Sequence, residues 1–233
     1  MDAARILAMA SGGAYLRIMS EPRKKQPAKR RRKSAPRQDF LTGKLLIAMP
    51  NMTDPRFERS VILMVSHDAD HAMGVVINKP LADIELGDLL EQLDIDPRQG
   101  AGGDPVFYGG PMQTDRGLVI HTLDYQSSQT MPVGGEIGVT ASKEILVDIG
   151  GNQPGRDAPA KYLLTIGHAG WGPGQLESEI AVNAWCHSNA DAGLIFGAEK
   201  TDLWSAALKS LGVTSAMFSP EWSNSRPDDA PLN

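Results

Sequence analysis

The sequence is poor in cysteine and has no long apolar run. Its 233 residues include one cysteine, Cys186, which excludes an internal disulfide framework and fits a reducing cytosol. The apolar stretches fall far short of the roughly 20 residues that a helix needs to cross a bilayer. We therefore expect a cytoplasmic protein without a membrane span. A hydrophobic content of 41% is that of a soluble globular chain, and the length fits one domain with tails.

Familiar catalytic and cofactor signatures are also missing. The glycine-rich run at 167–174, GHAGWGPG, lacks the lysine and hydroxyl of a phosphate-binding loop and the GxGxxG spacing of a dinucleotide site. His67 and His71 have a spacing that joins two metal ligands only on a helix, and they lie in a turn between two expected strands. We predict no cofactor, no metal site and no catalytic residue. A non-enzymatic protein is favoured, and an enzyme is left open.

Charge is divided unequally along the chain. The whole sequence has 23 basic and 28 acidic residues, a net charge of −5. Residues 1–39 hold 11 of the basic and 3 of the acidic residues, so they carry +8, and the remaining 12 basic and 25 acidic residues carry −13. Phosphate is therefore attracted by the first segment and repelled by the rest of the chain.

We expect residues 1–39 to be a disordered basic extension. Residues 21–38 combine three prolines and nine basic residues with no large apolar side chain, so they cannot bury enough surface to offset the entropy of ordering. This segment is either a solvated extension or an arm that binds nucleic acid or anionic lipid non-specifically. Residues 1–20 make a poor signal peptide and leave open a transit peptide or a true start at Met19. The basic residues of the arm are Arg23, Lys24, Lys25, Lys29, Arg30, Arg31, Arg32, Lys33 and Arg37.

Residues 40–218 are expected to form the folded domain, and residues 219–233 a flexible C-terminal tail. Some expected strands follow one another as hairpins and others are joined through helices, which is typical of a mixed sheet in an α+β domain. Apolar runs predict strands at 41–49, 60–66, 73–77, 106–108, 117–123, 136–140, 162–166 and 192–196. Helical spacing predicts helices at 86–93, 142–149, 176–185 and 202–211.

The stretch at 162–185 is where we expect a site. An apolar strand leads into the turn at 167–174, and a helix follows. Glycines let backbone approach backbone or ligand, and a helix N-terminus leaves amide donors free. Cys186 and His187 come directly after this expected helix. As helix neighbours they would point about 100° apart, so they do not form a nucleophile–base pair.

Six residues are the candidates for a ligand pocket. Arg116, alone among glycines at a strand start, either binds a carboxylate or phosphate or pairs with a structural acid. His121 is either a buried, hydrogen-bonded histidine or a base. Trp171 is either a lid on the core or a stacking platform for a planar ligand. The complete set is Lys79, Arg116, His121, His168, Trp171 and Gln175.

Five short runs, taken in order between residues 40 and 218, resemble the YqgE/AlgH family of bacterial proteins. They are LIAMP at 46–50, Asp54-x-x-Phe57-x-x-Ser60-Val61, GVVINKP at 74–80, YGGP with DRGLVIHT at 108–122, and GWGPGQLESEI with NAW at 170–185. The resemblance implies a single α+β domain whose mixed sheet curls partly into a barrel flanked by helices. It also implies a cytosolic bacterial protein of uncharacterised, regulatory type. Two features depart from the family: the long basic extension, and Val65 where some members carry a cysteine.

Three functions remain in view. The first is a non-enzymatic regulatory protein with an unknown protein or small-molecule partner, consistent with the label of transcriptional regulator that the resemblance brings. No helix-turn-helix pattern supports direct DNA reading by the domain. The alternative is a metabolite- or nucleotide-binding module, or an enzyme, with a pocket near Trp171 and Arg116. The third is non-specific nucleic-acid binding through the basic arm.

Overall fold

The computed structural model describes residues 40–96, 102–151, 157–197, 200 and 202–212. The expected basic extension, all nine basic residues of its arm and the expected tail at 219–233 lie outside these ranges, so those expectations stay predictions. The described strands are β1 Lys44–Ala48, β2 Val61–His67, β3 Ala72–Val76, β4 Pro80–Glu85, β5 Pro105–Tyr108, β6 Met112–Thr122, β7 Met131–Gly134, β8 Ile137–Thr140, β9 Tyr162–Trp171 and β10 Trp185–Asn189. The described helices are α2 Leu86–Gln92, α3 Lys143–Gly150, α4 Gln175–Ala181, α5 Ala192–Gly197 and α6 Leu203–Ser210.

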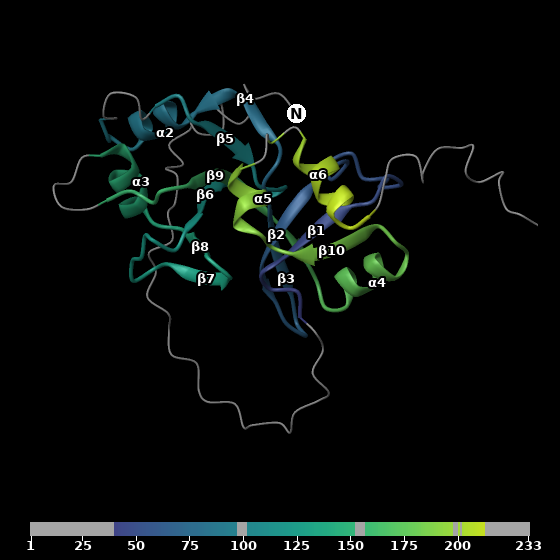
Figure 1. The fold of residues 1–233 in the computed structure, drawn as a ribbon. Coiled ribbons are helices and arrows are strands. Elements are labelled where there is room, and N and C mark those ends of the chain that lie inside the picture. The colour runs from purple at the N-terminus through teal and green to yellow at the C-terminus, as the bar shows by residue number, and fades with distance from the viewer. Residues whose placement is uncertain (1–39, 97–101, 152–156, 198–199, 201, 213–233) are drawn as a thin grey trace, which may run out of the picture.

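One ten-stranded sheet runs through the described domain in the order β10-β1-β2-β3-β9-β6-β8-β7, with β5 beside β9 and β4 beside β5. Strand β5 is parallel to β9, and the other strand pairs are antiparallel. The predicted mixed sheet, the α+β class and the expected hairpin of β2 with β3 are therefore confirmed. Figure 1 shows the helices lying around this sheet, with α2 and α3 near one end and α4 and α6 near the other.

The sheet curls until β7 reaches the start of β1. Gly43, just before β1, has a φ of +75°, and a Cβ built on it would lie 2.1 Å from the carbonyl oxygen of Val133 in β7. A residue with a side chain does not fit there, so glycine permits this contact. Because β7 is one end of the strand order and β1 lies near the other, the sheet forms a half-barrel.

Both faces of the curled sheet are buried. Leu45 and Ile47 of β1 point into a cluster covered by α5 and α6, whereas the alternate residues Leu46 and Ala48 point into a second cluster covered by α4. This alternation is what a strand dictates, since successive side chains face opposite sides. A third cluster holds α2 and α3 against β5, β6 and β9. None of the helices in the described ranges is long and apolar enough to span a membrane.

Two predicted elements at the C-terminal side are wrong. The helix expected at 176–185 ends as α4 at Ala181, because Asn183 takes a left-handed φ of 57° and the chain then enters strand β10. The strand expected at 192–196 is helix α5. Its missed signal is Asp191, whose Oδ1 accepts the backbone N–H of Leu194 at 2.7 Å, which is the bond of an N-cap residue.

Strands β4 and β7 are absent from the predicted elements, and β9 is longer than predicted. Pro80 begins β4 and Pro132 lies within β7, and proline in a run argues against a strand except at an edge. Both strands do lie at edges, since β4 pairs with β5 and β7 pairs with β8. Strand β9 continues through Trp171, so the turn expected at 167–174 begins only after this tryptophan.

Candidate functional site

Strand β9 is crossed at Gly167 by the segment that follows β5. Gly167 has a φ of +78°, Gly110 has a φ of +149°, and a Cβ built on Gly109 would lie 2.2 Å from the carbonyl oxygen of Gly167. The Gly109 N–H donates to the Ile166 carbonyl at 2.7 Å, and the Gly109 carbonyl accepts the N–H of Val76 at 2.8 Å. The two backbones are in direct contact, which is the close approach that glycine allows.

The pairing of β6 with β9 shifts register at this crossing. Met112 pairs with His168 and Gly117 pairs with Ile166, so residues 113–116 of β6 stand against a single residue of β9. Such a bulge interrupts the ladder, bends its strand and re-aims the side chains beside it. The bulge places Arg116 of β6 near β9 without a regular partner position.

Arg116 and His168 are two of the six candidate residues, and the register shift places them close enough for the charge of Arg116 to act on His168. Both are partly buried. Burial lowers the pKa of His168 below its ordinary value, and the positive charge of Arg116 lowers the same pKa further. Within the described ranges, neither side chain has a hydrogen-bond or ion-pair partner. Among the described residues, Arg116 is therefore not paired with a structural carboxylate, which was the second of its two alternatives.

Trp171 and Gln175 form a second group, around Glu179 of α4. Oε2 of Glu179 accepts the indole N–H of Trp171 at 2.9 Å and that of Trp185 at 2.8 Å, and Oε1 accepts the side-chain amide of Gln175 at 2.9 Å. Trp171 is 5% exposed and Trp185 is 3% exposed, with the rings edge to face at 6.1 Å. Trp171 is thus a buried lid that ties α4 to β9 and β10, which matches the first of its two alternatives.

Lys79 lies apart from these groups, against the loop before β2. Its Nζ donates to the Arg56 carbonyl at 2.8 Å. Burial lowers the pKa of Lys79, and the charges of Glu58 and Asp54 oppose that shift. The Arg56 guanidinium in turn binds the Asp54 carboxylate, with 2.6 Å between Nη2 and Oδ2. The described contacts of Lys79 are therefore those of a group that secures this loop.

His121 is fully buried, and its ring belongs to a hydrogen-bonded chain that includes two threonine hydroxyl groups. Its Nδ1 lies 2.9 Å from the Thr122 carbonyl, its Nε2 lies 2.9 Å from Oγ1 of Thr140, and that oxygen lies 2.9 Å from Oγ1 of Thr130. Burial lowers the pKa of His121, although the bond to the Thr122 carbonyl raises it in part. His121 matches the buried, hydrogen-bonded alternative. The six candidates thus lie at four separate places.

The structure also contains a hollow that no sequence pattern indicates. Its volume is about 400 Å³, and it opens beside the start of β9, between β5 and α5. At its edge the Tyr162 hydroxyl donates a short hydrogen bond to Asp104, and burial is the main cause that raises the pKa of Tyr162. Its walls come from three stretches that lie far apart in the sequence, so no local motif reveals it. The lining residues that carry rings or charges are Asp104, Phe107, Lys161, Tyr162, Phe196 and Lys200.

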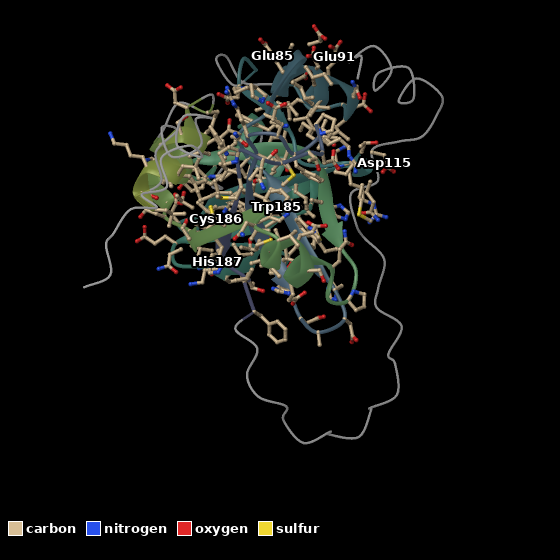
Figure 2. All side chains as sticks on the ribbon, turned by 90° about the vertical axis from the view of Figure 1, so that its right-hand side faces the viewer. Glu85, Glu91, Asp115, Trp185, Cys186 and His187 are labelled. Atoms are coloured by element: carbon tan, nitrogen blue, oxygen red, sulfur yellow. The ribbon has the colours of Figure 1, made fainter. Side chains whose placement is uncertain are left out.

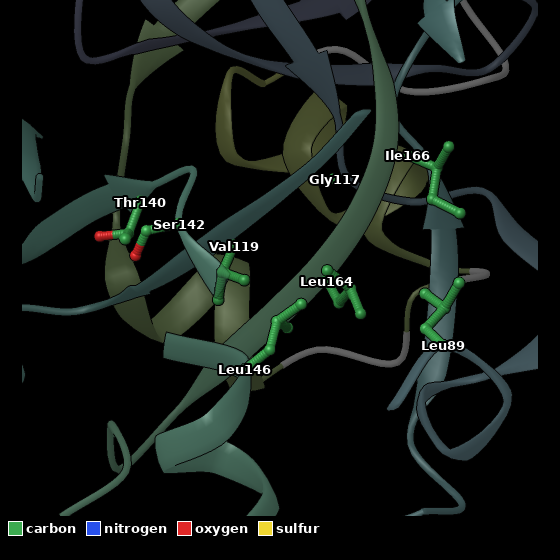
Figure 3. Close-up of a pocket in the computed structure, with 8 residues that line it drawn as sticks. All are labelled: Leu89, Gly117, Val119, Thr140, Ser142, Leu146, Leu164 and Ile166. Carbon is green, nitrogen blue, oxygen red and sulfur yellow. The ribbon is translucent and has the colours of Figure 1, made fainter. Parts of the chain in front are cut away.

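A second cavity is far smaller. It lies between β6, β9, α2 and α3, where Figure 3 shows mainly aliphatic side chains with the hydroxyl groups of Thr140 and Ser142 on one side. Its volume of about 10 Å³ is space for about one water molecule. The buried Ser142 Oγ has no hydrogen-bond partner among the residues in the described ranges. This cavity fits a structural water and not an organic ligand.

The remaining histidines and the cysteine have separate surroundings. His67 accepts the Leu41 N–H at Nδ1, and its Nε2 lies 3.0 Å from Glu177. Cys186 and His187 lie on β10 (Figure 2), so they face opposite sides of a strand. This corrects the helical geometry expected for them and leaves the same conclusion. Burial raises the pKa of the Cys186 thiol. Across the described residues, no three His, Cys, Asp or Glu side chains gather in a way that could hold a metal ion.

Together these features define a class: a single-domain α+β protein with a half-barrel of mixed strands, two neighbouring basic side chains at a bulge and a separate hollow. Residues 45–216 match the family described as AlgH-like, and the chain belongs to that family. The resemblance that the sequence motifs carry is therefore confirmed.

Relatives and solved structures agree with this assignment. The chain is 47% identical to the UPF0301 protein SPO0296 of Ruegeria pomeroyi over 77% of this chain and 96% of that protein. It is 45% identical to a UPF0301 protein of Paracoccus denitrificans over 78% and 95%. The solution structure of the AlgH protein from Pseudomonas aeruginosa matches with a TM-score of 0.63 and 34% identity, over 87% of this chain and 100% of that one. A crystal structure of protein DIP2367 from Corynebacterium diphtheriae, 19% identical with a TM-score of 0.59 over 76% and 90%, shares the fold.

Proposed function

We propose that this protein is a non-enzymatic regulatory protein of the cytoplasm, and that its input is a small molecule bound in the hollow beside the start of β9. The observation that carries this proposal is the hollow itself. Its volume of about 400 Å³ falls within the range of about 300 to 1,000 Å³ that ligand pockets usually occupy. This proposal moves the binding site away from the pocket expected near Trp171.

The lining of the hollow supports a flat, apolar ligand with a negative charge. The partly buried rings of Tyr162 and Phe196 and the buried Phe107 line the hollow, and two ammonium groups, Lys161 and Lys200, stand beside them. The Lys200 ammonium bonds the carbonyl of Ile195 in α5, which places its charge at the wall. The carboxylate of Asp104 already accepts the Tyr162 hydroxyl. The lining therefore has two ammonium groups and one carboxylate, which favours a ligand with a negative charge.

The position of the hollow supports a regulatory role. Phe196 belongs to α5, whereas Phe107 and Tyr162 belong to β5 and β9. A ligand that touches all three joins a helix to two strands distant in sequence, and it stabilises that arrangement by mass action. Contact with DNA, if regulation uses it, falls to the basic arm in this proposal, because the remainder of the chain carries a net charge of −13 from 12 basic and 25 acidic residues.

The test is a fluorescence titration of the full chain with 8-anilinonaphthalene-1-sulfonate, an aromatic anion. The fluorescence rise reports dye held against apolar surface and not dye attracted to the basic arm, so we expect it to fit one site per chain. Binding should be about tenfold weaker after the double change Lys161→Glu and Lys200→Glu, since each removes a charge-assisted contact. Lys209→Glu, on the exposed side of α6, is the matched control and should bind as the natural chain does. Equal binding by all three proteins would exclude the hollow as the site.

The same assay identifies the natural ligand class. Aromatic carboxylates, nucleotides and other metabolites are screened for displacement of the dye, and each hit is recovered from the protein after prolonged incubation. A non-enzymatic role requires that the hit return with unchanged mass. Conversion of a hit, lost in the double lysine variant, would make the hollow an active site and overturn the non-enzymatic part of the proposal.

A further inference from the structure

The bulge between β6 and β9 holds two basic side chains that lack the partners basic groups normally have. Two other charged side chains in the described ranges show what such partners look like. The Arg56 guanidinium has its carboxylate in Asp54, and the Glu179 carboxylate has three donors. Arg116 and His168 are partly buried and have no such partner there.

Two basic groups held close together raise the free energy of the folded state unless a negative charge lies near them. Burial and a like charge both disfavour the charged form of a histidine, and these are the two causes that lower the pKa of His168. No carboxylate counts among the causes of that shift. The neighbouring Asp115 is exposed, and Figure 2 shows it at the outer edge of the side chains. The positive charge at this point therefore lacks a negative one.

The backbone holds the residues that carry these two side chains near each other. Gly110 and Gly167 cross in direct contact, and a Cβ on Gly110 would lie 2.2 Å from the carbonyl carbon of His168. His168 is thus fixed on β9 at the crossing, and Arg116 ends the bulged part of β6. A site on two strands locked against each other is preorganised, which is what binding of a small ion requires.

We propose that Arg116 and His168 form a binding site for an oxyanion, the phosphate or carboxylate group of a small molecule. A guanidinium donates two parallel hydrogen bonds to such a group, and an imidazole N–H adds a third donor. Met112 lies opposite His168 in the register and is 47% exposed, so the apolar part of the ligand has a surface beside the anion. This site is independent of the hollow and does not rest on the function proposed for it.

The experiment follows the ring of His168 in the full chain by nuclear magnetic resonance. The sequence has five histidines, and their ring signals are assigned by single substitutions. Inorganic phosphate and malonate are titrated separately at about pH 7, near the range where histidine changes charge. A local signal is needed because the basic arm also attracts anions, and a measurement on the whole molecule would count both.

We expect one of the two anions to shift the His168 signals saturably and to raise the pKa of His168. A stronger response to phosphate identifies phosphate compounds as the ligand class, and a stronger response to malonate identifies carboxylates. Arg116→Gln should weaken this response about tenfold or more. Arg59→Gln, which removes an exposed guanidinium stacked on Trp204, should leave it unchanged. Thermal unfolding of both variants checks that they are folded.

Two results would overturn the proposal. One is the absence of any saturable His168 response to either anion at millimolar concentration. The other is an equal response in the natural chain and in folded Arg116→Gln, which would mean that the anion acts elsewhere. Because dye binding in the hollow is measured separately, failure of this site leaves the proposed function standing, and the reverse also holds.

Discussion

Glu179 of α4 and Arg116 of β6 are charged side chains beside β9, and their surroundings differ. Glu179 accepts three hydrogen bonds, two of them from buried indole groups. Arg116 meets a second basic group and no acceptor in the described ranges. The first arrangement stabilises the protein by itself, since every polar group has its partner. In the second arrangement, the oxyanion proposed to bind Arg116 and His168 supplies the missing partner from outside the chain. The difference separates a structural part of β9 from a part available for binding.

The largest effect is expected where β9 is crossed. Gly109→Ala places a Cβ 2.2 Å from the Gly167 carbonyl oxygen, so the two backbones must separate. We expect a loss of about 3 kcal/mol in the free energy of unfolding, measured by urea denaturation. Gly103→Ala is the matched control, because a Cβ there meets nothing within 4 Å, and it should change stability by less than about 0.5 kcal/mol. Equal stabilities would mean that the crossing is looser than described.

The next effect is expected at the carboxylate of α4. Glu179→Ala leaves the indole N–H groups of Trp171 and Trp185 without their acceptor, and both rings are buried. Leaving such donors unsatisfied should cost about 2 kcal/mol, seen as a lower urea midpoint. Glu91→Ala, an exposed change on α2, is the control and should stay within about 0.5 kcal/mol. If the two variants were equally stable, the contrast between Glu179 and Arg116 would disappear.

The smallest effect is a loss of stability in acid that depends on Arg116. His168 has a pKa lowered in the folded state, so the unfolded chain binds its proton first as the pH falls. Above about pH 6.5, the ordinary histidine value, the ring is neutral in both states and His168 does not change the free energy of unfolding. As the pH falls from there toward the lowered pKa, the free energy of unfolding decreases by at most about 1.4 kcal/mol per pH unit for one proton. His121 contributes with the same sign.

Arg116→Gln directly tests the direction of this change in stability with pH. It removes one cause of the lowered pKa of His168, so the pKa should rise toward its ordinary value and the loss of stability in acid should become smaller. Urea denaturation near neutral pH and in mild acid measures the difference, with Arg59→Gln as the control for charge removal. A variant that loses more stability in acid than the natural chain would contradict the arrangement of these two residues.

The sequence predicts the centre of the sheet better than its edges. The apolar runs at 60–66 and 73–77 have no breaker, and they form β2 and β3 as a hairpin. The run at 192–196 is equally apolar, but the side-chain cap from Asp191 makes it helical. A five-residue apolar run does not distinguish the two outcomes, because its period is too short to read.

The candidate site is predicted only in part, for a physical reason. The glycine neighbours of Arg116 mark it as a candidate, but its position beside His168 depends on a register shift between strands far apart in the sequence. Trp171 is a buried lid because its indole N–H donates to Glu179 and its ring is covered, and the sequence pattern reveals neither contact. The hollow depends on Phe196 and Lys200, which follow a cap that the pattern did not reveal.

The central position of β9 has a consequence for how the chain is made. Strands β3, β5 and β6 all pair with β9, yet β9 starts only at Tyr162. While the ribosome synthesises the chain, these earlier strands emerge with an open edge and an apolar face each, and unpaired edges favour aggregation. The sheet closes only when its last inner strand arrives, and contacts so distant in sequence form slowly. The nascent chain is therefore expected to need chaperone protection until β9 has left the ribosome.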